Sequence, residues 1–194
     1  LDLTPQNAEA VLDLEGRFLA PGFIDMHLHG ALNRDAMEAS PDAFRTICGF
    51  HASGGTTALA LTTVVAVPEA ILKVLEAVGT LDPNDTGGSR ILGVHLEGPY
   101  FSKEKPGAHS PELIRNPDPA EYMEWLKYKD RITQVTLAPE LPGALEMIDV
   151  LVRNNIRVSG GHTDAWDEEA SAAFAHGLRQ ATHTYNCCLL YTSD

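Results

Sequence analysis

Three short apolar runs in this chain each stop at a side chain that can bind a metal ion. They stop at Glu97, which Gly98-Pro99 follows, at His162 and at His183. The carboxyl ends of parallel strands lie on one rim of an α/β barrel, so side chains from different strands can meet there. The ligands of a mononuclear metal site converge in this way. The pattern therefore predicts a metal site at the rim of a barrel and favours a metal-dependent hydrolase.

Short β-type runs alternate with helical patterns along the chain, as is typical of βα units. The runs are almost continuously hydrophobic, which indicates parallel strands that are buried on both faces. Ser40-Pro41 and Asp118-Pro119 are helix-start signals, and Thr163 and Asp164 are expected to cap the last helix. The sequence predicts strands at 23–27, 56–63, 91–95, 132–138, 156–159 and 180–183, with helices starting near residues 41, 68, 119, 142 and 164.

The length of these units selects the architecture. Each repeat takes about 32 residues, and eight repeats fill the roughly 250 residues of a closed (β/α)8 barrel. A doubly wound sheet usually carries a Gly-rich phosphate loop after its first strand, whereas the first strand here ends in His27-Leu-His29. We therefore predict an α/β fold, a (β/α)8 TIM-type metal-dependent hydrolase barrel that is incomplete here, with about six βα units.

Three segments are expected along the chain. Residues 1–20 alternate in polarity around a turn at Glu15-Gly16, so we predict a hairpin that is the remnant of a small β-sandwich-like element. Residues 21–186 form the partial barrel. Residues 187–194 are atypical and are expected to be a non-native tail.

Composition excludes several classes of partner. The formal net charge of −13 argues against nucleic acid and anionic membranes, because both need a basic surface. The apolar runs are far shorter than the roughly 20 residues of a membrane span. The three cysteines show no disulfide spacing, which favours a reduced, cytoplasmic protein. The net charge does not exclude a small anionic ligand, because its binding depends on the local charge of a pocket.

A second group of histidines precedes the first three ligand candidates. Residues i and i+2 of a strand share a face, so His27 and His29 can coordinate one ion together. His95 shares a face with Glu97 but is expected to pack or to support a ligand. Outside the strand ends, His51 and His176 are expected to be structural.

Ordered motifs between residues 11 and 186 resemble the amidohydrolase superfamily and, within it, the N-acetylglucosamine-6-phosphate deacetylases. The segments that carry the resemblance are Pro21-Gly-Phe-Ile-Asp-Met-His-Leu-His-Gly30, Gly55-Thr-Thr57, His95-Leu-Glu-Gly-Pro-Tyr-Phe101, Lys105-Pro-Gly-Ala-His109, Val135-Thr-Leu-Ala-Pro-Glu140, Gly160-Gly-His-Thr-Asp-Ala165 and Thr182-His-Thr-Tyr-Asn186. The His-x-His pair alone marks only the superfamily, whereas the segments at 95–101, 105–109 and 135–140 are specific to the deacetylases.

The resemblance implies a role for each candidate residue. Glu97, His162 and His183 would hold the principal metal, expected to be zinc with iron as the alternative, and His27 and His29 would hold a second ion in members that use two. The positions implied to contact the amino-sugar phosphate are Ala108, His109, Asn186 and Cys187.

The implied reaction converts N-acetylglucosamine 6-phosphate to glucosamine 6-phosphate and acetate. In the family, an aspartate at the end of the eighth strand exchanges the proton, and we expect it to lie beyond Asp194. No catalytic residue is therefore assigned, and the 194-residue chain is expected to lack measurable deacetylation. The parent protein is expected to be a homodimer.

Two other functions stay open. Amidohydrolases of cyclic amides bridge two metals with a carboxylated lysine on the fourth strand, and residues 132–138 contain no lysine. A non-catalytic partial barrel, metal-binding or structural, is the alternative from a different class, because an incomplete barrel leaves strand edges unpaired.

Overall fold

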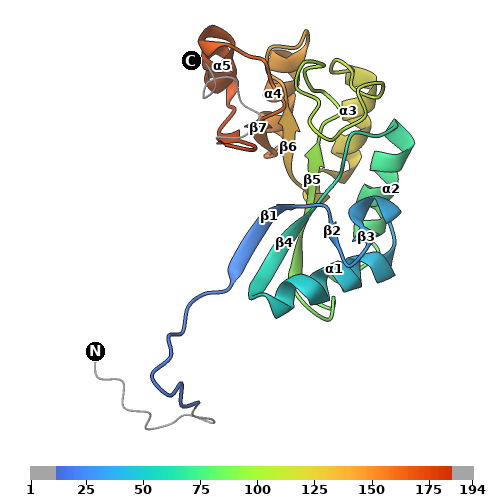
Figure 1. Ribbon diagram of the computed structural model, residues 1–194. Helices are drawn as coiled ribbons and strands as arrows, with labels where there is room; N and C mark the ends of the chain where they lie inside the picture. The colour runs from blue at the N-terminus through green and yellow to red at the C-terminus, as the bar shows by residue number, and fades with distance from the viewer. Residues whose placement is uncertain (1–11, 185–194) are drawn as a thin grey trace.

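The computed structural model describes residues 12–184, and a six-stranded parallel sheet is its centre. The sheet curls into a half-barrel with helices against its outer side (Figure 1). Its strands run in the order β1 (Phe23–Leu28), β4 (Thr56–Thr62), β5 (Arg90–Glu97), β6 (Ile132–Leu137), β7 (Arg157–Gly160) and β8 (Gln180–Ala181). The predicted partial barrel with six βα strands is therefore confirmed.

Helices connect these strands, and most begin where the sequence predicts. The Ser40 side chain accepts from the Ala43 amide and caps α1, and Asp118 accepts from the Ala120 amide and caps α3. The helical elements are η1 (Ala36–Glu38), α1 (Pro41–Ser53), α2 (Pro68–Val78), α3 (Pro119–Trp125), η2 (Leu126–Arg131), α4 (Ala144–Arg153) and α5 (Asp167–His176).

The expected start of the last helix was wrong. Helix α5 begins at Asp167, and Trp166 rather than Thr163 or Asp164 occupies its N-cap position. The Thr163 hydroxyl donates to Glu140, and the Asp164 amide donates to the same carboxylate at 2.7 Å. Glu140 therefore binds the hydroxyl and the amide that would otherwise lie at the start of a helix beginning at residue 164.

The N-terminal segment differs from the expected hairpin. The turn at Glu15-Gly16 is present, and the Arg17 amide donates to the Leu14 carbonyl at 2.9 Å. No strand forms between residues 12 and 22, and residues 1–11 lie outside the described part of the chain. A small antiparallel ladder of β2 (Gly30–Ala31) and β3 (Arg34–Asp35), which the sequence did not predict, follows β1 instead.

The two faces of the sheet differ in chemistry. On β5, Val94 and Leu96 are fully buried in the apolar core cluster. Successive side chains of a strand point to opposite faces, so His95 and Glu97 face the inside of the half-barrel. The core thus lies between sheet and helices, and the inner face is free to carry polar groups. In the described residues, no helix is long and apolar enough to cross a membrane.

Candidate metal centre

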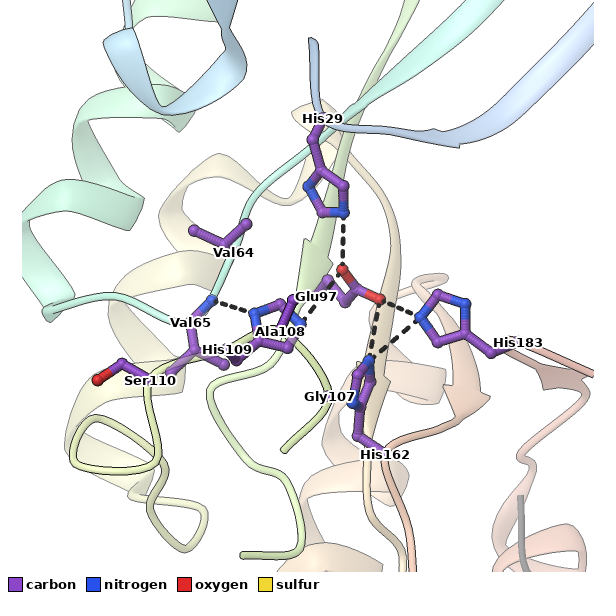
Figure 2. A pocket seen from close by; sticks show the side chains of 10 residues that line it. All are labelled: His29, Val64, Val65, Glu97, Gly107, Ala108, His109, Ser110, His162 and His183. Atoms are coloured by element: carbon purple, nitrogen blue, oxygen red, sulfur yellow. Dashed lines mark hydrogen bonds and ion pairs between the residues drawn. The ribbon is translucent and has the colours of Figure 1, made fainter. Parts of the chain in front are cut away.

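A cavity of about 490 Å³ lies at the carboxyl ends of the strands. Glu97 lines the cavity, and imidazole rings surround its carboxylate (Figure 2). The cavity is lined by His29, Val64, Val65, Glu97, Gly107, Ala108, His109, Ser110, His162 and His183.

Glu97 connects the histidines. Its side chain is only 1% exposed, and its Oε1 lies 3.0 Å from His183 Nε2, 3.2 Å from His27 Nε2 and 3.4 Å from His162 Nε2. Its Oε2 lies 3.1 Å from His29 Nε2. A buried carboxylate needs this many partners, because an unpaired charge away from water is costly. The four predicted histidine ligands therefore meet at the carboxylate of the fifth, Glu97.

Glu97, His162 and His183 have the spacing of a tetrahedral site. Their facing atoms are 3.0, 3.2 and 3.4 Å apart. A tetrahedron with zinc bonds of 2.0–2.2 Å has edges of about 3.4 Å. These three donors can thus accept one ion with only small movements.

His27 and His29 form a second set around the carboxylate, in which His27 contacts Oε1 and His29 contacts Oε2. Their Nε2 atoms are 3.3 Å apart and are 3.2 and 3.1 Å from the two oxygens of Glu97. One ligand atom from each of these three residues lies within 4.8 Å of the other two, which is close enough to hold one ion. Glu97 is shared by both sets, so its carboxylate can bridge two ions.

The backbone at two ligand candidates is strained. His162 has φ +51° and His183 has φ +57°, which is the left-handed region that residues with a Cβ rarely adopt. Each such residue costs on the order of 1–2 kcal/mol. Strain of this kind clusters at functional sites, where the surrounding structure holds it in place. It directs both imidazoles toward Glu97.

Hydrogen bonds orient two of the candidate ligands through their other ring nitrogen. His162 Nδ1 lies 3.0 Å from the Lys105 carbonyl, and His29 Nδ1 lies 3.2 Å from the Thr62 carbonyl. A carbonyl only accepts, so each Nδ1 carries a proton, and in the neutral ring that a metal requires each Nε2 has its lone pair toward the cavity. This arrangement is typical of histidines that bind metals.

His109 has the opposite arrangement. The Val65 amide donates to His109 Nδ1 at 3.4 Å, so the proton lies on Nε2, which is 3.6 Å from Glu97 Oε2. The ring therefore presents a donor to the cavity. Ligand atoms of His109, Glu97 and His162 lie within 4.8 Å of one another, but this tautomer gives His109 no free lone pair toward the cavity.

The site perturbs the protonation of its members. Burial alone would raise the pKa of Glu97, but hydrogen bonds from His109, His162, His183 and His27 outweigh it and lower the pKa well below its usual range. Burial opposes protonation of His29, yet the hydrogen bond to Glu97 leads to a net raised pKa. The carboxylate is thus held ionised, as a metal ligand must be.

Two segments of the β5–α3 loop pack directly on His162. The Phe101 ring stacks on the imidazole with centroids 4.3 Å apart and planes at 19°. A Cβ on Gly107, which has φ +58°, would come within 2.8 Å of His162 Cε1. The loop that carries Ala108 and His109 into the cavity is therefore fitted to the ring of a ligand candidate.

The structure describes two of the four residues that were predicted to contact the substrate. Ala108 and His109 line the cavity, whereas Asn186 and Cys187 lie outside the described residues, and contact of these four with a substrate stays a prediction. The sequence did not predict the Lys105 and Thr62 carbonyls that orient the histidines. Backbone carbonyls have no sequence signal, so only the fold could reveal them.

His95, which the sequence predicted to pack or to support a ligand, lies beneath the site and is fully buried. Burial lowers the pKa of His95 to about 3, and the neighbouring imidazole of His27 adds to this effect. The ring is therefore neutral, and its nitrogens bond Thr62 and Thr136.

Sequence comparison finds relatives with deacetylase names. The chain is 39% identical over 169 residues to an N-acetylglucosamine-6-phosphate deacetylase of Vibrio furnissii, covering 87% of this chain and 42% of that protein. It is 34% identical to an N-acetylgalactosamine-6-phosphate deacetylase of Escherichia coli O157:H7, covering 91% of this chain and 47% of that protein. The chain thus spans about half the length of the relatives it matches.

Structural comparison agrees. The crystal structure of N-acetylglucosamine-6-phosphate deacetylase from Pasteurella multocida superposes with a TM-score of 0.88 at 31% identity, covering 97% of this chain and 50% of that one. The resemblance inferred from the motifs is therefore confirmed. The profile of the amidohydrolase family matches residues 18–191, which is most of the sequence. This chain belongs to the amidohydrolase family, whose members are generally metal-dependent hydrolases.

Proposed function

We propose that this chain supplies the metal centre of an enzyme that deacetylates N-acetylglucosamine 6-phosphate. The single observation that carries the proposal is the convergence of four imidazoles on the buried carboxylate of Glu97. In the proposal, Glu97, His162 and His183 hold the principal ion, which is zinc, with iron as the alternative. His27 and His29 hold a second ion together with Glu97.

The chemistry of the site fits the hydrolysis of an amide. A bound divalent metal supplies an activated water and polarises a carbonyl. His109 is placed to donate its Nε2–H to the acetyl carbonyl oxygen of the substrate, because the Val65 amide fixes the proton on that nitrogen. Ala108 lies beside it in the cavity wall, and Asn186 and Cys187 are proposed as further contacts to the sugar.

The identity of the substrate rests on the relatives. Those from Vibrio furnissii and Pasteurella multocida are named for N-acetylglucosamine 6-phosphate, and the one from Escherichia coli O157:H7 is named for the galactosamine epimer. We infer the glucosamine substrate, with glucosamine 6-phosphate and acetate as products. We further propose that the parent protein is a cytoplasmic homodimer and takes neither nucleic acid nor membrane as a partner.

Zinc titration of the metal-free chain tests the centre. We expect zinc to bind, and Glu97→Gln to weaken binding by at least about 100-fold, because a neutral amide replaces the ionised ligand that both histidine sets share. Glu76→Gln is the matched control, because the Glu76 carboxylate accepts from the Tyr128 hydroxyl at 2.9 Å and does not line the cavity. Unchanged zinc affinity in Glu97→Gln would remove Glu97 from the site.

A chimera tests the activity. In it, this chain replaces the matching segment of the Vibrio furnissii relative, and acetate release is measured with both 6-phosphorylated epimers. We expect release from N-acetylglucosamine 6-phosphate, and loss of release with Glu97→Gln. A folded, zinc-loaded chimera that deacetylates neither sugar would contradict the deacetylase proposal, and preference for the galactosamine epimer would correct the substrate.

A further inference from the structure

A connected layer of polar side chains crosses the inside of the half-barrel beneath the metal centre. His95 lies at its middle, with Nδ1 3.3 Å from the Thr62 hydroxyl and Nε2 2.7 Å from the Thr136 hydroxyl. Thr136 contacts the Thr182 hydroxyl at 2.8 Å, and Thr182 contacts the Ser159 hydroxyl at 2.7 Å. These five residues, Thr62, His95, Thr136, Ser159 and Thr182, are called the interior polar layer.

The layer forms one directed chain of hydrogen bonds. The Leu28 amide donates to the Thr62 hydroxyl at 3.0 Å, and an amide can only donate. The Thr62 hydroxyl can then donate to His95 Nδ1, which leaves the proton of the neutral ring on Nε2, facing the Thr136 hydroxyl. The same direction continues through Thr136 to Thr182. Every link is thus satisfied with His95 uncharged.

Each strand end that bears a ligand candidate is tied to this layer. Leu28, whose amide donates to Thr62, separates His27 from His29 in the sequence. His95 precedes Glu97 by two residues on the same face of β5, and Thr182 directly precedes His183.

The last ligand candidate is connected through a glycine. Gly161 precedes His162 and packs so closely that a Cβ there would lie 2.7 Å from Thr182 Cβ and 2.9 Å from Thr136 Cγ2. The Thr62 carbonyl also accepts from the ring of His29. Each ligand candidate is therefore close to the layer in the chain or in space. His29 contacts a member directly, and the other candidates lie within two residues of a member or of a residue that contacts one.

We propose that the interior polar layer is a positioning device that fixes the spacing of the ligands around Glu97. The proposal rests on the metal centre proposed above. Buried polar networks are rigid when every member is satisfied and costly when one partner is lost. Thr136 is fully buried, so its hydroxyl has no water to replace His95 or Thr182. Because the layer joins neighbouring strands, it fixes the relative positions of the strand ends and of the ligand atoms that they carry.

Substitution of two threonines on the same strand separates this role from general stability. Thr136→Val removes the hydroxyl that joins His95 to Thr182, whereas Thr133→Val removes a hydroxyl that donates to the Val94 carbonyl at 3.0 Å on the other face of β6. The zinc dissociation constant of each folded chain is measured against a chromophoric chelator. We expect about tenfold weaker binding for Thr136→Val, as for the loss of other groups that orient ligands.

The controls restore or spare the layer. Thr136→Ser keeps the hydroxyl, and we expect it to recover most of the affinity, whereas Thr133→Val is expected to stay within about twofold of the parent, because it lies outside the layer. Thr182→Val separates Thr136 from Ser159 at a half-buried position and serves as a second variant if Thr136→Val does not fold.

A readout without metal complements the titration. Nitrogen NMR of the imidazole rings is expected to show His95 as the Nε2–H tautomer, with slow proton exchange that Thr136→Val accelerates. Parental zinc affinity in both Thr136→Val and Thr182→Val, or equal losses in Thr133→Val and Thr136→Val, would overturn the positioning role and leave the metal centre standing. Failure of the unsubstituted chain to bind zinc would overturn the centre and this proposal together.

Discussion

The two faces of the half-barrel strands follow different physical rules. On the helix side, Leu96 and its neighbours are fully buried among apolar side chains, so the contribution of this face is hydrophobic and nondirectional. On the inner side, Glu97 and His95 are equally buried, but each is held by directed hydrogen bonds. Residues adjacent in sequence therefore serve stability on one face and the site on the other.

The contrast explains why the inner face tolerates so much polarity. Parallel sheets in α/β proteins are covered by helices on the outside and obtain most of their apolar burial there. The inside of a barrel is closed by side chains, and polar side chains can fill it when all their hydrogen bonds are made. Each member of the interior polar layer makes at least one such bond.

The largest expected effect is on the helix side. Leu96→Ala should lower the free energy of unfolding by about 3 kcal/mol, through lost apolar burial and the cavity that remains. The zinc affinity of the folded protein should stay within about twofold of the parent, because the substitution leaves the opposite face intact. Urea unfolding of the metal-free chain and zinc titration under native conditions measure the two quantities.

Leu137→Ala is the control for this prediction. Leu137 is also fully buried in the core cluster, but on β6, so a similar loss of stability is expected. If either variant weakened zinc binding more than about tenfold while still folded, the two faces would be coupled, and the comparison above would fail.

Much of the fold was predictable because its signals are local. The six apolar runs and the cap at Ser40 depend on residues close in sequence, and the structure places strands and helix α1 there. The start of α5 was not predictable, because Glu140, distant in sequence, binds the Thr163 hydroxyl and the Asp164 amide. A long-range carboxylate overrode a good local capping signal.

The candidate site divides in the same way. Strand ends and the His-x-His spacing predicted that Glu97 and its histidines would converge. Two other features of the site depend on loop conformation and could not be predicted from residue types. They are the left-handed backbone at His162 and His183 and the positions of the Lys105 and Thr62 carbonyls. The roles of Asn186 and Cys187, and the foreign origin expected for residues 187–194, stay predictions.

The next effect tests how the inner face is covered. Gly107→Ala should weaken zinc binding by about tenfold, because the new methyl group meets His162 Cε1 at 2.8 Å and displaces the ring. Gly87→Ala is the matched control, because Gly87 also has a positive φ, +71°, but open space where the methyl group would lie. Equal zinc affinities for the two variants would show that the loop does not position the ligand.

The smallest expected effect is the pH response of His29, which has opposite signs in the metal-free and zinc-loaded protein. Folding raises the pKa of His29 above its ordinary 6.5, since burial is outweighed by the bond to Glu97. In the metal-free chain, this stabilisation is complete below the unfolded-state pKa and is lost as pH rises through the higher folded value. Zinc binding needs the neutral ring, so it should begin to weaken, as pH falls, already above pH 6.5.

Urea unfolding with chelator at about pH 6 and about pH 8 measures the first sign, and zinc titration at the same values measures the second. His29→Gln should remove the His29 share of both responses, while Glu97 stays ionised because its own pKa is lowered. Leu96 and Leu137 on the helix side do not titrate, so Leu137→Ala should keep the parental pH dependence. A His29→Gln chain with unchanged pH dependence would show that His29 does not share a proton with Glu97 on the inner face.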